Sequence, residues 1–292
     1  MSKILITGHP GQDAKLMHQL LCNDHEVVLF NEDIRNKKLI YSYLNLCKPD
    51  FIFNFAAISD PKACNDVKKV LETNTFSVAS WLEGIHSRCP KCRFFSAGSS
   101  LELSGDPSLY AASKRIASQI CEEYRRVHGL YVVHGILFNH ISPYANPNLG
   151  LMKLIFGAKD IAEKVKAGKY NYDPLIISNG KLKDITDARD TVRMIWELMQ
   201  YSTPVVKNTE IGAGKLYSEW DIVKVVFDYY GLEMDRYYRD PKTYIRYELY
   251  KEEHVKNEQR LAFKTAHVQG PEIEFEEMIR GILEGGINKT RS

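Results

Sequence analysis

Residues 3–14 read KILITGHPGQDA, an apolar run followed by a turn with two glycines. The first five residues predict a buried strand, and the amphipathic residues after the turn predict a helix. Gly8 permits a tight turn, Gly11 lets the backbone approach a bound group, and Ala14 allows close packing of the helix on the strand. Tight turns between a strand and a helix also contain glycine for purely structural reasons. In this context, however, the stretch indicates a dinucleotide-binding loop with pyrophosphate at the positive helix end.

The alternation of strand and helix continues through the first half of the chain. Apolar β-rich runs predict strands at 3–7, 26–30, 51–55, 93–96 and 131–138. Helical periodicity predicts helices at 12–22, 37–46, 67–86 and 110–128. This order is typical of the α/β class and predicts a Rossmann fold, a doubly wound parallel sheet with helices on both faces.

The regular alternation of strands and helices ends after Asn139, and residues 142–148 are rich in turn-forming residues. Helical patterns then predict helices at 151–167, 186–199, 219–230 and 272–283. We therefore expect residues 1–140 to form the nucleotide-binding core, with later segments at about 170–215 returning to it. Residues 141–292 are expected to form mainly a smaller C-terminal portion that binds the substrate.

Composition argues against several other classes of protein. The 39 basic and 37 acidic residues leave a formal net charge of +2, without the clustered basicity of nucleic-acid-binding proteins. No run reaches the roughly 18 apolar residues of a membrane span, and the start of the chain has no signal-peptide pattern. Cys89 and Cys92 lack a second pair to complete a zinc site. We expect a cytoplasmic protein with a small-molecule partner, no nucleic acid, no membrane and no metal.

Tyr110 and Lys114 stand four residues apart, one above the other on a predicted helix. A free tyrosine has a pKa near 10, so it is a poor base at neutral pH unless a nearby cation stabilises its phenolate. With Lys114 beside it, Tyr110 can exchange the proton of a hydroxyl while a hydride moves to or from a nicotinamide. The pair follows a strand that ends at 95–100 (FSAGSS), which favours this interpretation over a chance surface pair.

With these motifs in this order, nearly the whole chain resembles the extended short-chain dehydrogenase/reductase family. There, Gly-x-x-Gly-x-x-Gly/Ala, a Ser or Thr after the mid-sheet strand, and Tyr-x-x-x-Lys form one site. The resemblance implies that the cofactor is NAD or NADP and that Ser99, Tyr110 and Lys114 are catalytic. It also implies a set of cofactor-binding residues: Gly8, Pro10, Gly11, Gln12, Asp13, Asp33, Ile34, Phe55, Ala56, Ala57, Asn74 and Lys114.

Two stretches, at 7–13 and 135–143, are similar to the GDP-mannose 4,6-dehydratase branch of that family, and the second also resembles 4-keto-6-deoxymannose reductases. The resemblance implies a nucleotide-sugar substrate, as in polysaccharide biosynthesis. It places Asn139 against the sugar diphosphate, with Ser100 and Lys183 as further substrate contacts. A capped turn is the alternative interpretation of Asn139.

Glu102 departs from the dehydratase pattern. A 4,6-dehydratase oxidises C4, removes a proton at C5 and expels the C6 hydroxyl, and the branch supplies the extra acid/base as a Glu two residues after the catalytic Ser/Thr. Counted from Ser99, that position holds Leu101, and Glu102 comes one residue later. Glu102 reaches the sugar only if a bulge absorbs the extra residue. Otherwise it faces solvent, and a 4-keto-6-deoxy sugar reductase or an epimerase is the better interpretation.

Three further questions stay open from the sequence. Glu32 favours NAD and Arg35 favours NADP, while Asp33-Ile34 is assigned to the adenine-side strand. A non-catalytic dinucleotide-binding protein is the alternative to these three kinds of enzyme. The family implies a homodimer or higher homo-oligomer through the helix at 110–128, whose apolar stripe can equally pack on its own sheet.

Overall fold

The computed structural model describes residues 1–59, 66–172, 175–178, 182–202, 207–234, 245–248 and 270–288. The chain divides into two compact units. Among the described residues, the first contains residues up to 138, 191–211 and Gly270, and the second contains the rest. The segment that returns to the first unit therefore begins at residue 191, later than the predicted 170. Residues 183–187 instead form a strand of the second unit, because they pair there with residues 139–141.

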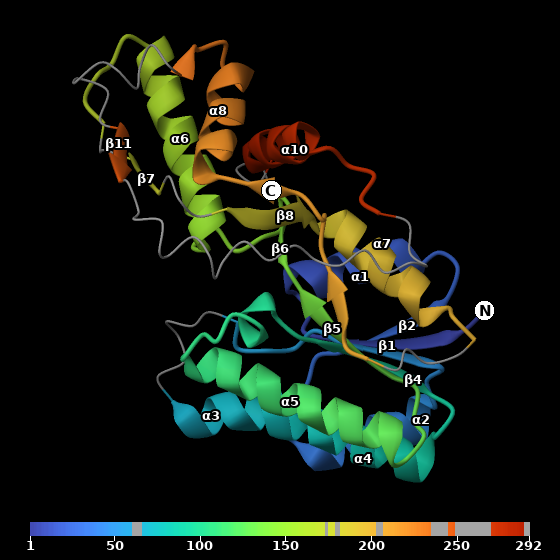
Figure 1. Cartoon of the computed structure of the whole chain (residues 1–292). Coiled ribbons are helices and arrows are strands. Elements are labelled where there is room, and N and C mark those ends of the chain that lie inside the picture. Colours follow the sequence, from blue (N-terminus) through green and yellow to red (C-terminus); the bar gives the residue numbers. More distant parts are fainter. Residues whose placement is uncertain are drawn as a thin grey trace. The chain divides into compact units, whose positions relative to one another are not determined.

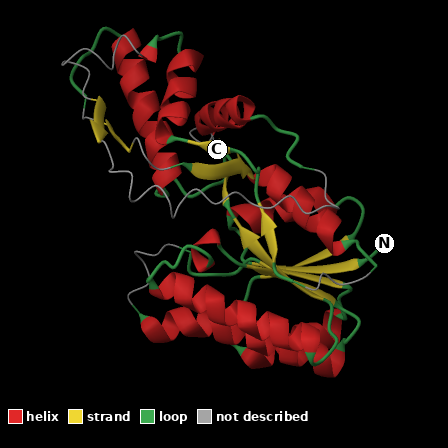
Figure 2. Cartoon of the chain, viewed as in Figure 1, coloured by secondary structure: helices red, strands yellow, loops and turns green. Residues whose placement is uncertain are grey.

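A six-stranded parallel sheet forms the centre of the first unit (Figures 1 and 2). The strand order is β2-β1-β3-β4-β5-β9. The order reverses beside β1, which is the place where doubly wound folds bind ligands at the carboxyl ends of their strands. The predicted α/β Rossmann fold is confirmed. The strands are β1 (Lys3–Thr7), β2 (Glu26–Phe30), β3 (Phe51–Asn54), β4 (Arg93–Ala97), β5 (Val132–Leu137) and β9 (Thr209–Ile211).

Helices cover both faces of this sheet, with α2, α4 and α5 on one side and α1 and α7 on the other (Figure 1). On the first side Trp81 is fully buried among apolar side chains of the strands. On the other side the Trp196 ring lies edge-on to Phe51, with centroids 5.2 Å apart. The helices are α1 (Gln12–Leu21), α2 (Lys37–Cys47), α3 (Val67–Leu71), α4 (Ser77–Arg88), α5 (Leu109–Arg126) and α7 (Ala188–Met199).

The helix predicted at 67–86 is interrupted by a wider π-helical turn, η2 (Glu72–Phe76). π-turns inside helices occur frequently at functional sites. This one turns Asn74 and Thr75 into the buried interior of the unit.

The second unit holds a three-stranded sheet of order β10-β8-β6 and a two-stranded parallel sheet of β11 and β7. Helices α6, α8 and α10 pack together through fully buried apolar side chains such as Ile155, Phe227 and Ile279. Thr186 and Asp187 complete β8, so the helix predicted from residue 186 begins at 188. The elements are β6 (Asn139–Ile141), α6 (Gly150–Lys166), β7 (Leu175–Ser178), β8 (Lys183–Asp187), β10 (Leu216–Tyr217), α8 (Glu219–Tyr229), β11 (Ile245–Glu248) and α10 (Phe275–Asn288).

Two kinds of feature are absent from the described residues. No helix among them is long and apolar enough to span a membrane. In the same part of the chain, no three His, Cys, Asp or Glu side chains are grouped as metal ligands would be.

Candidate active site

The glycine loop between β1 and α1 leaves no room for side chains at its two glycines. Gly8 has a φ of +89°, and a Cβ there would lie 2.7 Å from the Ala56 nitrogen. Gly11 donates its N–H to the Gly8 carbonyl at 2.8 Å, and a Cβ on Gly11 would lie 2.8 Å from that oxygen. The N-cap residue of α1 is Gly11, which has no side chain to cap the helix. The loop is therefore a backbone cradle at a helix N-terminus, the geometry that suits a phosphate group.

A second loop, which follows β3, is held against the first by Thr7. The Thr7 hydroxyl donates to Asn54 Oδ1 at 2.7 Å and accepts from the Ala56 N–H at 3.1 Å. The predicted cofactor segment Phe55, Ala56 and Ala57 is half-buried here, at the carboxyl ends of neighbouring strands. The structure thus brings together the two loops that the sequence assigned to the cofactor.

Asp33 and Ile34 lie in a turn after β2. The strand that the sequence predicted at these two residues does not form. Ile34 is buried, whereas Asp33 is exposed and binds the Arg35 guanidinium at 2.6 Å. Hydrogen bonds from Arg35 hold the pKa of Asp33 below its ordinary value. Asp33 and Arg35 line an open hollow with Asn36, Glu72, Phe76, Ser77 and Ser80.

Asn74 links the cofactor loop to the helix that carries the catalytic motif. Its side chain accepts from the Ile58 N–H at 2.8 Å and donates to the Ile58 carbonyl at 3.1 Å. It also donates to Ser113 Oγ at 3.1 Å, and Ser113 Oγ donates to the Tyr110 carbonyl at 2.7 Å. Asn74 therefore positions two segments of the site from within the protein.

Replacing Asn74 by Ala is expected to lower the free energy of unfolding by about 1–3 kcal/mol, because both polar backbone groups of Ile58 lose their partner. Urea denaturation measures this loss. Asn45→Ala is the control, since Asn45 is exposed on α2, and it should change stability by less than about 0.5 kcal/mol. Equal losses in the two variants would contradict the assigned role.

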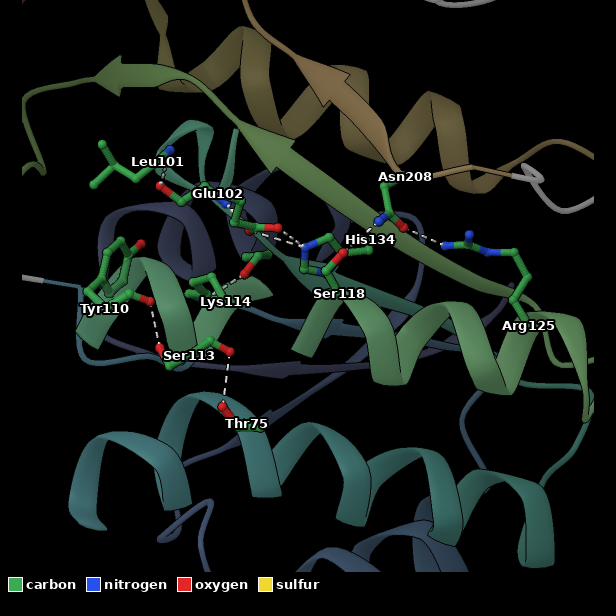
Figure 3. Close-up of polar contacts among 12 residues, drawn as sticks. Thr75, Leu101, Glu102, Tyr110, Ser113, Lys114, Ser118, Arg125, His134 and Asn208 are labelled. Carbon is green, nitrogen blue, oxygen red and sulfur yellow. Dashed lines mark hydrogen bonds and ion pairs between the residues drawn. The ribbon is translucent and has the colours of Figure 1, made fainter. Parts of the chain in front are cut away.

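Tyr110 and Lys114 lie buried in the first two turns of α5, whose N-terminus is capped by the Ser108 hydroxyl. Lys114 Nζ lies 5.9 Å from the centroid of the Tyr110 ring. It also donates to the Ala97 carbonyl at 2.6 Å, which anchors it to the end of β4. Burial lowers the pKa of Lys114 to about 8, while the negative charge of Glu102 acts to raise it. Figure 3 shows the pair and its contacts.

Ser99 and Ser100 follow β4 and begin a short 3-10 turn, η3 (Ser100–Glu102). Ser99 is buried and Ser100 is half-buried. This turn accommodates the extra residue, and the Glu102 side chain is buried, so it does not face solvent as the second alternative predicted. Its carboxylate accepts from the Ser99 N–H at 2.6 Å and contacts the ring of His134 (Figure 3).

His134 is the main residue of the site that sequence reasoning missed. It lies at the centre of β5, which is buried along its whole length, and its side chain is fully buried. The available signal was one titratable side chain in an otherwise apolar strand, VVHGIL, because such groups are rarely fully buried unless they are paired.

Asn139 and Lys183 lie in the second unit, on paired strands β6 and β8. Asn139 is exposed and its amide donates to the Asp184 carbonyl at 3.3 Å. Lys183 Nζ lies 3.5 Å from a Glu219 carboxylate oxygen. The structure brings these two predicted substrate contacts near one another, and their role toward the substrate stays a prediction.

Residues 10–274 match the model of the family described as GDP-mannose 4,6 dehydratase. The chain belongs to this family. It is 26% identical to "GDP-mannose 4,6 dehydratase 2" of Arabidopsis thaliana over 86% of this chain and 69% of that protein. Another relative, the GDP-mannose 4,6-dehydratase of Vibrio cholerae, is 27% identical over 74% of this chain and 68% of that protein.

Solved structures share the fold. UDP-glucose 4-epimerase of Thermotoga maritima superposes with a TM-score of 0.78 at 14% identity, covering 99% of this chain and 100% of that one. The dTDP-glucose 4,6-dehydratase of Bacillus anthracis, solved in complex with NAD, gives a TM-score of 0.72 at 16% identity over 99% and 97% of the chains. The resemblance drawn from the sequence motifs is thus confirmed for both the family and the fold.

Proposed function

We propose that the chain is an NAD(P)-dependent enzyme that transfers a hydride at C4 of a nucleotide-activated hexose, with a GDP-sugar as its substrate. Two findings support the proposal. One is membership of the GDP-mannose 4,6 dehydratase family over residues 10–274. The other, which carries it, is the buried Tyr110–Lys114 pair anchored to the strand end that leads into Ser99.

The residues of the first unit fit a dinucleotide. The cradle at Gly8 and Gly11, which a Cβ would fill, would hold the pyrophosphate against the N-terminus of α1. Asp33 and Ile34 would flank the adenosine end and Phe55–Ala57 the middle, while Lys114 would reach the nicotinamide side. When bound, the cofactor supplies the hydride acceptor or donor. Either NAD or NADP is compatible with the turn at Asp33, which presents both a carboxylate and a guanidinium.

The catalytic roles follow from the chemistry of the three side chains. Tyr110 Oη takes the proton of the C4 hydroxyl as the hydride leaves C4, and it returns a proton in the reverse direction. The Lys114 ammonium stabilises the tyrosinate, and Ser99 Oγ hydrogen-bonds the C4 oxygen as it becomes a carbonyl. In the complete dehydration, the C5 proton and the C6 hydroxyl then leave as water. The hydride returns to C6 as C5 takes up a proton, which balances the one lost by the C4 hydroxyl. The sugar loses one water and the cofactor is restored.

A second candidate, reduction of a 4-keto-6-deoxy nucleotide sugar, is favoured by one observation. Dehydration needs an acid/base group at C5, and the carboxylate of Glu102 is bound to Ser99 and His134. Reduction at C4 needs only Ser99, Tyr110 and Lys114. Epimerisation at C4 would use the same three side chains.

Incubation of the purified protein with GDP-, dTDP- and UDP-hexoses, followed by mass spectrometry, tests the proposal. Loss of one water from GDP-mannose with no net consumption of cofactor identifies a dehydratase. Gain of two hydrogens by the 4-keto-6-deoxy sugar, with oxidation of NAD(P)H, identifies the reductase instead. Failure to convert any nucleotide sugar with either cofactor would contradict the proposed function.

We also propose a homodimer formed through α5, as the family resemblance implies. Ile116 on this helix is 42% exposed, whereas Ile120 and Tyr124 pack against the core of their own unit. Light scattering of the wild type and of Ile116→Glu tests it, since a buried carboxylate at the interface would separate the subunits.

A further inference from the structure

Glu102 and His134 form a buried pair at the carboxyl end of the first unit's sheet. The His134 side chain is fully buried and that of Glu102 is 4% exposed. His134 Nε2 lies 3.0 Å from Oε2 and 3.2 Å from Oε1 of Glu102, and the Ser99 N–H donates to Oε1 at 2.6 Å. Both carboxylate oxygens therefore have partners inside the protein.

On the basis of the proposed function, we infer that the Glu102–His134 pair is a positioning element for hydride transfer at C4 and that Glu102 takes no proton from the sugar. A general base must come within hydrogen-bond reach of the proton that it removes. A carboxylate with both oxygens engaged and almost no exposed surface does not offer that reach. Figure 3 shows it directed toward the His134 ring.

Gly98 makes room for the pair. A Cβ on Gly98 would lie 2.5 Å from His134 Nε2 and 2.6 Å from Glu102 Oε1, closer than real Cβ contacts come. The Gly98 N–H also donates to the Gly135 carbonyl at 2.7 Å, so the backbone cannot easily move away. The glycine before Ser99 is therefore explained by the pair that packs on it.

The Glu102–His134 pair and Lys114 all contact the segment 97–99, which begins at the last residue of β4. Lys114 Nζ binds the carbonyl of Ala97, the pair covers Gly98, and the Glu102 carboxylate accepts the N–H of Ser99. Ser99 Oγ in turn accepts the Leu101 N–H at 3.3 Å. The position of the Ser99 hydroxyl thus depends on the Glu102 carboxylate, because that carboxylate holds the backbone N–H of Ser99 and so the main chain that carries the hydroxyl.

The carboxylate also acts on the charge of Lys114. Burial disfavours the ammonium, and the negative charge of Glu102 opposes that effect, as does Cys121 on the same helix. Burial likewise acts to lower the pKa of His134, but Cys121 and Glu102 outweigh it and raise the pKa to about 9.

Glu102→Gln tests the inference, because it keeps the shape and an acceptor oxygen while it removes the charge. The matched control is Glu123→Gln, since Glu123 is an exposed carboxylate on α5. His134→Gln is a second variant that keeps a donor toward Glu102. Single-turnover absorbance of the reduced nicotinamide measures C4 hydride transfer by itself, and product mass measures loss of water.

We expect Glu102→Gln to slow C4 hydride transfer about tenfold or more, while KM and the dissociation constant of NAD(P)H change by less than about twofold. The decline of kcat/KM at high pH should move to lower pH, because Lys114 loses its proton more easily without the carboxylate. His134→Gln should slow the same step, and Glu123→Gln should change neither. A purely structural role would not move the pH profile.

A variant that keeps C4 hydride transfer and loses only the elimination of water would overturn the inference and make Glu102 the C5 base. Unchanged kinetics in both variants would overturn it as well. NMR titration of the His134 ring and the Lys114 ammonium needs no substrate: Glu102→Gln should lower both pKa values. If no sugar is converted, the proposed function fails. The titrations then still decide whether the pair acts on Lys114.

Discussion

Tyr110→Phe is expected to reduce kcat by about two orders of magnitude or more, the usual contribution of a positioned acid/base group. The phenol is buried on α5 beside Lys114 and supplies the proton that moves with the hydride. Phe keeps the ring and its packing. The dissociation constant for NAD(P)H, measured by fluorescence, should therefore stay within about twofold.

Tyr124→Phe is the matched control for this variant, since Tyr124 lies on the same helix and is partly buried against the core. It should keep wild-type activity. A fully active Tyr110→Phe protein would assign the proton transfer to another group. A loss shared by both variants would point to damage to α5 instead of loss of chemistry.

Gly11→Val is expected to abolish binding of NAD and NADP in calorimetry. The first side-chain carbon would lie 2.8 Å from the Gly8 carbonyl, so the loop must change shape, and the added methyl groups would occupy the space in which the pyrophosphate approaches the backbone. Gly11 is exposed, so the core should be little affected. Thermal unfolding of the cofactor-free protein checks that expectation.

Gly150→Val is the control, because a Cβ on Gly150 meets no atom within 4 Å. It should bind the dinucleotide as the wild type does. Binding by Gly11→Val at wild-type affinity would show that the glycine loop is a structural turn only, and the cofactor site would have to be sought elsewhere.

The sequence by itself determined the alternation of strands and helices, the glycine loop and the Tyr110–Lys114 pair. Each of these depends on a few neighbouring residues. The hydrophobic period predicts the strands and helices, the backbone freedom of Gly8 predicts the turn, and the four-residue spacing places Tyr110 and Lys114 on one side of a helix. The family membership predicted from those motifs is confirmed. The errors in the fold were of three kinds: boundaries such as the strand end at Asp187, the π-turn inside the helix predicted at 67–86, and the strands after residue 138, which were not predicted.

The tertiary structure alone decided the surroundings of the catalytic motif. Asn74, placed by resemblance against the cofactor, binds Ile58 and Ser113. His134 is brought beside Gly98 because β4 and β5 pair in parallel with Ser96 opposite His134, a register that no local pattern contains.

The direction of the Glu102 side chain depends on that same pairing. From the sequence, one inserted residue in an extended chain offered only two faces, toward the sugar or toward solvent. The 3-10 turn at 100–102 and the imidazole on the neighbouring strand turn the carboxylate away from solvent and into the protein. A buried carboxylate takes the orientation in which its oxygens find partners, and those partners come from distant parts of the chain.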